Sequence, residues 1–206
     1  MRRRFTATAM AIAALLAPGL AQAHLVVTGM GPIYDGVTHF ALSPEDSLPV
    51  VALAFYAGLR GPGSSRLLLA VLPSAWFVGG LLACLSGVAL PPTALPLATA
   101  VVFLAMGGLL ASDLTLSTPY HAVAAIAVGL VRGAADLGGA PAEAGSLLDL
   151  AGMCVAAFAL FALAVSVTLP LKRFWMIVAA RVAGSWVAAA GLLLAGWILR
   201  FGAKVQ

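Results

Sequence analysis

Long apolar segments limit the folds open to this chain more than any other feature of its sequence. From residue 37 to residue 200 they follow one another with only short turns between them. Because an α-helix needs about 20 apolar residues to cross the hydrocarbon core of a bilayer, each segment is long enough to span a membrane. We therefore predict an all-α, polytopic membrane protein, with a bundle of six transmembrane helices. The predicted spans cover about 37–59, 67–90, 94–112, 119–138, 146–170 and 174–200.

The scarcity of charge supports the same fold class. Charged residues make up 9% of the chain and apolar residues 63%, whereas a soluble domain carries about 25% charged residues. The sequence therefore predicts one domain in contact with the lipid bilayer and no separate soluble domain. Cys84 and Cys154 each lie inside an apolar segment, so we interpret them as core residues rather than as a disulfide or a metal pair.

The first 23 residues have the pattern of a secretory signal peptide. Arg2–Arg4 form a basic start, Ala9–Leu20 form an apolar stretch, and Ala21-Gln22-Ala23 is a small-x-small cleavage site. We predict cleavage after Ala23, which leaves residues 24–206 as the transmembrane domain. Without the three leader arginines, eight basic residues stand against seven acidic ones, a net charge of +1. That balance gives no support for nucleic-acid binding.

The charges in the turns predict the orientation of the bundle. A cleaved signal peptide leaves the mature N-terminus outside the membrane. Two of the turns that then lie inside carry pairs of basic residues, Arg60 with Arg66 and Lys172 with Arg173, while the outer turns between spans carry none. The turns follow the positive-inside rule, whereas the C-terminal tail, with Arg200 and Lys204, lies outside in this orientation and does not follow it. We predict a multi-pass protein of the bacterial inner (plasma) membrane with a periplasmic N-terminus.

A histidine and an aspartate in the first predicted span are the strongest candidates for a binding site. His39 and Asp46 are seven residues apart, and seven steps of about 100° bring a helix back to nearly the same face. Charged groups within a bilayer are costly and are usually functional. An imidazole and a carboxylate on one inward face can bind a divalent cation such as Ni²⁺, Co²⁺ or Zn²⁺.

Pro44 lies between these two residues and leaves two interpretations of the backbone open. In the first, the helix continues with a kink, and carbonyl groups freed near Phe40 become additional oxygen ligands. In the second, Ser43 caps a new helix that begins at Pro44. Glu45 is then either a further metal ligand or an acid that compensates the dipole of the new helix.

Two other residues are candidate metal ligands. Cleavage after Ala23 would make His24 the first residue, and its free α-amine and imidazole together would chelate Cu²⁺ or Ni²⁺; alternatively, His24 only happens to follow the cleavage site. Asp136 in the fourth predicted span is a candidate ligand. It also stands four residues after Arg132, a spacing at which opposite charges pair on a helix. Arg132 itself is a fixed cation that would repel a metal ion.

Structural roles are predicted for several further polar and small residues. His121 begins the fourth span and is interpreted as an interfacial histidine, with a metal site on the exit side as the alternative. Charges inside a membrane normally find partners, and an Asp149–Arg181 pair is the simplest arrangement for the last two spans. The Gly79-Gly80 and Gly107-Gly108 pairs suit close packing between helices.

The segment around His39 resembles the HupE/UreJ family of hydrogenase and urease accessory membrane proteins, which are regarded as nickel or cobalt permeases. The first span of that family carries His-Pro, five further residues and Asp-His. His39 and Asp46 match the first His and the Asp, whereas Phe40 and Ser47 replace the Pro and the second His.

A second pattern of the family falls in the fourth predicted span. The family carries Phe-His-Gly-x-Ala-His-Gly-x-Glu there, and this chain matches it only at Gly133 and Ala135. Arg132 and Asp136 stand at the positions of the two histidines.

The resemblance implies a permease that carries nickel, or alternatively cobalt, to a metalloenzyme such as a hydrogenase or a urease. The metal would be cargo rather than a permanently bound cofactor, with His39, Asp46, Glu45, His24 and Asp136 as candidate ligands. The alternative is a non-transporting accessory protein that hands metal to, or assembles with, a metalloenzyme or its maturation proteins. Polar groups running right through the bundle would favour the permease. The sequence has no H-E-x-x-H or G-x-S-x-G pattern and does not indicate an enzyme.

Overall fold

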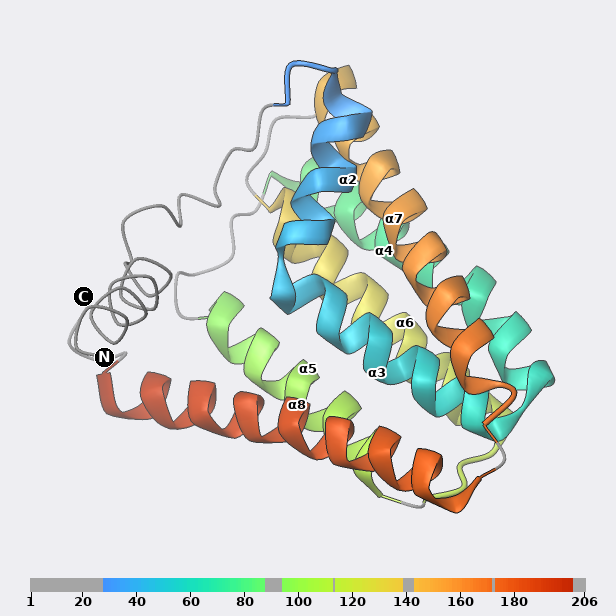
Figure 1. Ribbon diagram of the computed structural model, residues 1–206. Helices are drawn as coiled ribbons and strands as arrows, with labels where there is room; N and C mark the ends of the chain where they lie inside the picture. The colour runs from blue at the N-terminus through green and yellow to red at the C-terminus, as the bar shows by residue number, and fades with distance from the viewer. Residues whose placement is uncertain (1–27, 88–93, 113, 139–142, 172, 202–206) are drawn as a thin grey trace, which may run out of the picture.

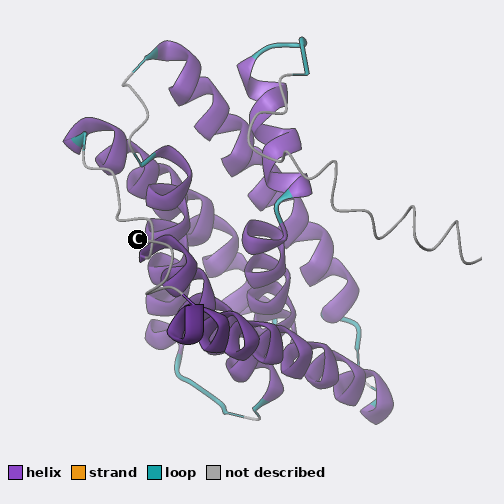
Figure 2. Ribbon diagram, turned by 90° about the vertical axis from the view of Figure 1, so that its left-hand side faces the viewer, coloured by secondary structure: helices purple, strands orange, loops and turns teal. Residues whose placement is uncertain are grey.

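The computed structural model describes residues 28–87, 94–112, 114–138, 143–171 and 173–201, and throughout these ranges it contains helices and loops without strands (Figure 2). The predicted signal peptide and His24 lie outside the described residues. The prediction of an all-α protein is confirmed. The helices are α2 (Pro32–Leu42), α3 (Pro44–Arg60), α4 (Pro62–Ser86), α5 (Ala94–Ala111), α6 (Thr118–Leu137), α7 (Ala144–Thr168) and α8 (Phe174–Phe201).

Five of these helices, α4 to α8, are long and apolar enough to cross a bilayer. They coincide with the last five predicted spans. The first predicted span is instead divided into α2 and α3, so within the described residues the structure has five candidate spans and one broken segment. The predicted count of six spans therefore depends on α2 and α3 crossing the membrane together.

The break between α2 and α3 has a local cause. Ser43 has an extended backbone, with φ −94° and ψ 101°, and Pro44 is the first residue of α3. Proline disfavours helical backbone in the residue before it and suits the first position of a helix. The second interpretation of this segment is thus the one observed, although the Ser43 side chain makes no capping hydrogen bond. Its backbone N–H donates to the carbonyl of His39 at 3.0 Å and closes the last turn of α2.

The helices pack in three groups around α3. In Figure 1, α2 lies along α7, α4 lies along α6, and α8 runs beside α5 at the lower edge of the molecule. Helix α3 contacts members of all three groups. Helix α8 is largely exposed and presents large apolar side chains outward, including Trp186 and Leu193, each 76% exposed. Such a surface is stable only when apolar solvent or protein covers it, in agreement with a membrane location.

Glycines allow α4 and α6 to approach closely. A Cβ on Gly133 would overlap the carbonyl of Trp76, and a Cβ on Gly79 would overlap backbone atoms of Leu130. Small residues at such contacts are typical of helix packing in membranes. The predicted packing role is thus observed for Gly79, whereas Gly108 meets no described atom within 4 Å. The close contact at Gly133 holds α6 against α4, and the neighbouring Arg132 is buried.

Candidate metal centre

Three of the predicted ligands meet inside the bundle. His39 on α2, Asp46 on α3 and Asp136 on α6 each offer one ligand atom, and these atoms lie within 4.8 Å of one another. Asp46 is 1% exposed, while His39 and Asp136 are partly buried. The reason for the proximity differs from the one predicted, since His39 and Asp46 do not share a face of one helix. The break at Ser43 instead turns α3 relative to α2, and α6 supplies the third group.

Arg132 joins this cluster and binds both carboxylates. Its Nε donates to Oδ1 of Asp46 at 2.6 Å, and its Nη2 pairs with the same oxygen. Nη2 also lies 3.5 Å from Oδ1 of Asp136, the helical pairing that the spacing predicted. Nη1 donates to the hydroxyl of Thr99 on α5 at 3.0 Å. Arg132 is 3% exposed, so the ion pair lies in a region of low dielectric constant, where charge–charge interactions are strong.

Trp76 and Thr99 are partners that sequence reasoning missed. The indole Nε1 of Trp76 donates to Oδ2 of Asp136 at 3.0 Å. A buried indole N–H normally finds an acceptor, so a tryptophan in the middle of a predicted span was a signal that a polar group lies nearby. Thr99 gave no comparable signal, because a lone threonine in an apolar segment can bond to the backbone of its own helix.

One oxygen of the cluster has no partner. Oδ2 of Asp46 is buried and accepts no hydrogen bond within the described residues. An unsatisfied buried acceptor costs about 1–3 kcal/mol, and more when it is charged. The unpaired oxygen favours a cation, and an imidazole with two carboxylates is a donor set for a divalent transition metal.

Comparison with known proteins agrees with this chemistry. A sequence model described as HupE / UreJ protein matches residues 12–194, which is most of the chain. The chain belongs to the HupE / UreJ family. Neither the curated proteins nor the solved structures give a match. Proteins of this family are membrane proteins that act in nickel or cobalt transport or as accessory proteins, rather than as enzymes.

In this HupE / UreJ protein, two residues of α6 join the centre in opposite ways. Asp136 contributes a ligand atom to the cluster, whereas Arg132 fills part of it with a tethered cation. Arg132 is therefore placed to compete with a metal ion for Asp46.

The remaining predicted residues lie elsewhere. Glu45 is exposed in the first turn of α3 and does not join the cluster, as expected of an acid that compensates the helix dipole. Asp149 lies on α7 with its backbone against Gly36 of α2. Since α8 packs on α5 and α3 and not on α7, the structure does not bring Asp149 and Arg181 together as predicted.

His121 belongs to a second polar cluster near the other end of α3 and α6. It is 2% exposed, so it is a core residue rather than an interfacial one. Its Nδ1 lies 2.9 Å from the hydroxyl of Ser64 and its Nε2 lies 3.2 Å from that of Tyr56. The Tyr56 hydroxyl donates to the carbonyl of Leu114 at 3.0 Å, so its single proton is used and Nε2–H of His121 is the donor toward it. Both ring nitrogens are therefore satisfied by protein groups.

Proposed function

We propose that this protein is a permease of the bacterial inner membrane for a divalent transition-metal cation, nickel or alternatively cobalt, that serves a metalloenzyme such as a hydrogenase or a urease. The observation that carries the proposal is the convergence of His39, Asp46 and Asp136 from three helices around a buried carboxylate oxygen that lacks a partner. Family membership supplies the class of metal.

The guanidinium of Arg132 gives the site the moderate affinity that transport requires. An ion held too tightly cannot leave, so conduction depends on binding that is favourable but weak. Arg132 already occupies Oδ1 of Asp46 and lies near Asp136, so an arriving cation must compete with it. On release, the guanidinium is in place to neutralise the carboxylates again.

The position of the cluster suits capture from the periplasm. One end of the bundle is basic, because it carries Arg60 at the end of α3, Arg66 in α4 and Arg173 before α8. The positive-inside rule assigns this end to the cytoplasm. Fourteen residues separate Asp46 from Arg60, which is about 21 Å of helix. The cluster therefore lies nearer the opposite end. A membrane potential of 100 mV, negative inside, favours inward movement of a divalent ion by about 4.6 kcal/mol.

An apolar layer separates the metal centre from the His121 cluster. This layer favours the second candidate function, that of a non-transporting accessory protein. From Asp46 to Tyr56, α3 rises about 15 Å, and the space between is filled by fully buried side chains such as Leu53, Leu72 and Val128. The two polar clusters are not continuous across this layer. A permease must open it, whereas a non-transporting accessory protein that offers metal to a metalloenzyme or its maturation proteins need not.

Uptake of radioactive nickel tests the proposal. Cells making His39→Ala or Asp46→Asn should accumulate at least about tenfold less nickel than cells making the wild type, because each change removes a ligand from a site with few ligands. Glu45→Gln is the matched control, since it removes an exposed acid next to Asp46 and should leave uptake unchanged.

Two results would contradict the assignment. Wild-type uptake by both ligand variants, at equal amounts of protein in the membrane, would remove this cluster from the function. If purified wild-type protein binds nickel but proteoliposomes containing it take up none under an inward negative potential, the accessory function replaces the permease.

A further inference from the structure

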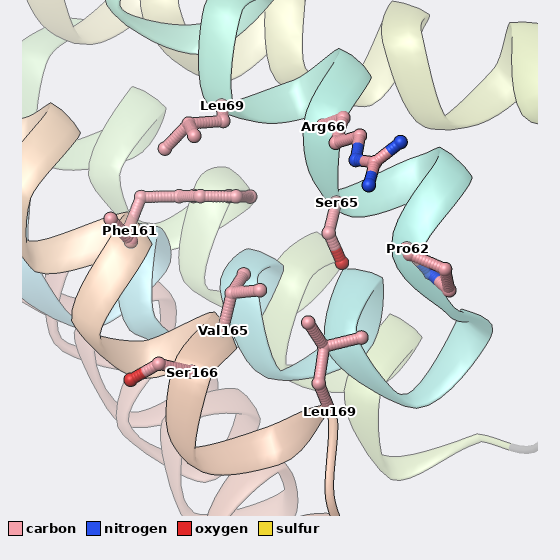
Figure 3. A pocket seen from close by; sticks show the side chains of 9 residues that line it. Pro62, Ser65, Arg66, Leu69, Phe161, Val165, Ser166 and Leu169 are labelled. Carbon is pink, nitrogen blue, oxygen red and sulfur yellow. The ribbon is translucent and has the colours of Figure 1, made fainter.

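A pocket between α4 and α7 lies outside the metal centre. It encloses about 300 Å³ at the basic end of the bundle. Figure 3 shows Leu69 of α4 turned toward Phe161 of α7 across this space, and Arg66 of α4 and Val165 of α7 also line it. No residue of the metal centre or of the His121 cluster lines it.

The lining changes character along the pocket. Pro62 and Leu169 line it at the end of the bundle, Arg66 and Ser166 lie about one helical turn further in, and Leu69 and Phe161 lie about one turn deeper again. The charged and hydroxyl groups thus lie in the outer half of the pocket, behind Pro62 and Leu169, and the deepest part is apolar. This order matches the order of groups across a membrane leaflet, where headgroups lie outside the acyl chains.

Arg66 is the polar group in the pocket that remains available to a ligand. The hydroxyls of Ser65 and Ser166 are both used within their own helices, by the carbonyls of Gly61 and Leu163. Arg66 forms no hydrogen bond or ion pair within the described part of the chain, and its guanidinium offers five N–H donors. A planar guanidinium binds phosphate oxygens in a bidentate manner.

We propose that the α4–α7 pocket binds an anionic phospholipid, with the headgroup phosphate on Arg66 and an acyl chain against Leu69, Phe161 and Val165. Complementary charge and the polar-to-apolar order of the lining together select this ligand. Basic pockets between transmembrane helices on the cytoplasmic side are suited to anionic headgroups. A bound lipid bridges α4 and α7, which flank the metal centre through their contacts with α6 and α2.

Native mass spectrometry of the purified full chain tests the proposal. Wild type, Arg66→Gln and Arg173→Gln are titrated with phosphatidylglycerol and with phosphatidylcholine of the same acyl chains. We expect wild type to retain phosphatidylglycerol in preference to phosphatidylcholine, and Arg66→Gln to bind phosphatidylglycerol about tenfold more weakly, because the charge-assisted hydrogen bonds to the phosphate are lost. Arg173→Gln removes the same charge from an exposed position at the same end, outside the pocket lining, and should bind as wild type does.

A fourth variant tests the apolar half of the pocket. Ala162→Phe fills the space beside Phe161 while Arg66 stays in place, and it should also lose phosphatidylglycerol. Equal weakening by Arg66→Gln and Arg173→Gln would assign the binding to diffuse surface charge and overturn the proposal. Equal retention of the two lipids, unchanged binding by Ala162→Phe, or full displacement by an equal concentration of inorganic phosphate would overturn it as well.

Discussion

Replacing Arg132 by glutamine should tighten metal binding while weakening the protein without metal. The guanidinium lies between Asp46 and Asp136, so a divalent ion held by these carboxylates is a near neighbour of a fixed positive charge. At a separation of about 5 Å and an effective dielectric constant of about 20, repulsion between charges of +2 and +1 is about 7 kcal/mol. In the wild type, movement of the guanidinium away from the bound metal ion reduces part of this repulsion. We therefore expect Arg132→Gln to bind Ni²⁺ at least about 100-fold more tightly, equivalent to about 2.7 kcal/mol.

The same substitution leaves two carboxylates in the core without their cation. Removing one partner of a buried ion pair typically costs about 3–5 kcal/mol, so the metal-free variant should unfold at a lower temperature than the wild type. Nickel should restore more stability to Arg132→Gln than it adds to the wild type. Arg132→Lys keeps the charge and should bind nickel more nearly as the wild type does.

Calorimetric titration and thermal unfolding, both on protein in lipid nanodiscs at one pH, measure these effects. Size-exclusion elution and helical circular dichroism establish that each variant is folded before binding is compared. If folded Arg132→Gln binds nickel no more tightly than the wild type, the guanidinium does not compete with the metal, and the explanation for weak binding and release is wrong.

Two further substitutions test the packing that holds the centre together. Gly133→Val places a side chain against the backbone of α4 and should lower the unfolding temperature, at a cost of about 3 kcal/mol in stability. The control Gly108→Ala adds a methyl group in open space and should be neutral or slightly stabilising. Equal effects of the two variants would mean that the close α4–α6 contact is not needed. Tyr56→Phe removes a buried hydroxyl that bonds to His121 and to the carbonyl of Leu114. It should lower stability in thermal unfolding by about 1–3 kcal/mol and leave nickel affinity unchanged. A loss of nickel affinity would instead connect the His121 cluster to the metal centre.

The parts of the fold that sequence reasoning predicted depend on local properties of the chain. Hydropathy and length locate α4 to α8, because each of these segments must bury its backbone polar groups within its own helix. The break before Pro44 was one of two interpretations, since the ring of proline prevents a regular helix but also permits a kink. The periodicity of a helix could not choose between them, and it supplied an incorrect reason for the proximity of His39 and Asp46.

Sequence reasoning singled out the three ionisable residues that meet in the candidate site and one pairing between them and Arg132, but it did not find the partners on other helices. His39, Asp46 and Asp136 were identifiable because ionisable groups are rare in apolar segments. The partners of Asp136 and Arg132 on neighbouring helices, Trp76 and Thr99, were not identifiable in this way. The Asp149–Arg181 pair was expected because both charges lie within spans, but α7 and α8 prove not to be neighbours.

By itself, then, the sequence determined that the chain is a helical membrane protein with a few costly ionisable groups, because the energy of burying charge and backbone in lipid is a property of each segment alone. Only the tertiary structure decided which of those groups meet. Helix pairing depends on small residues such as Gly133 and Gly79 that let two backbones approach, and these contacts set α6 beside α4 so that Arg132 reaches Asp46. The result is a centre in which a tethered cation and an unpaired carboxylate oxygen lie side by side.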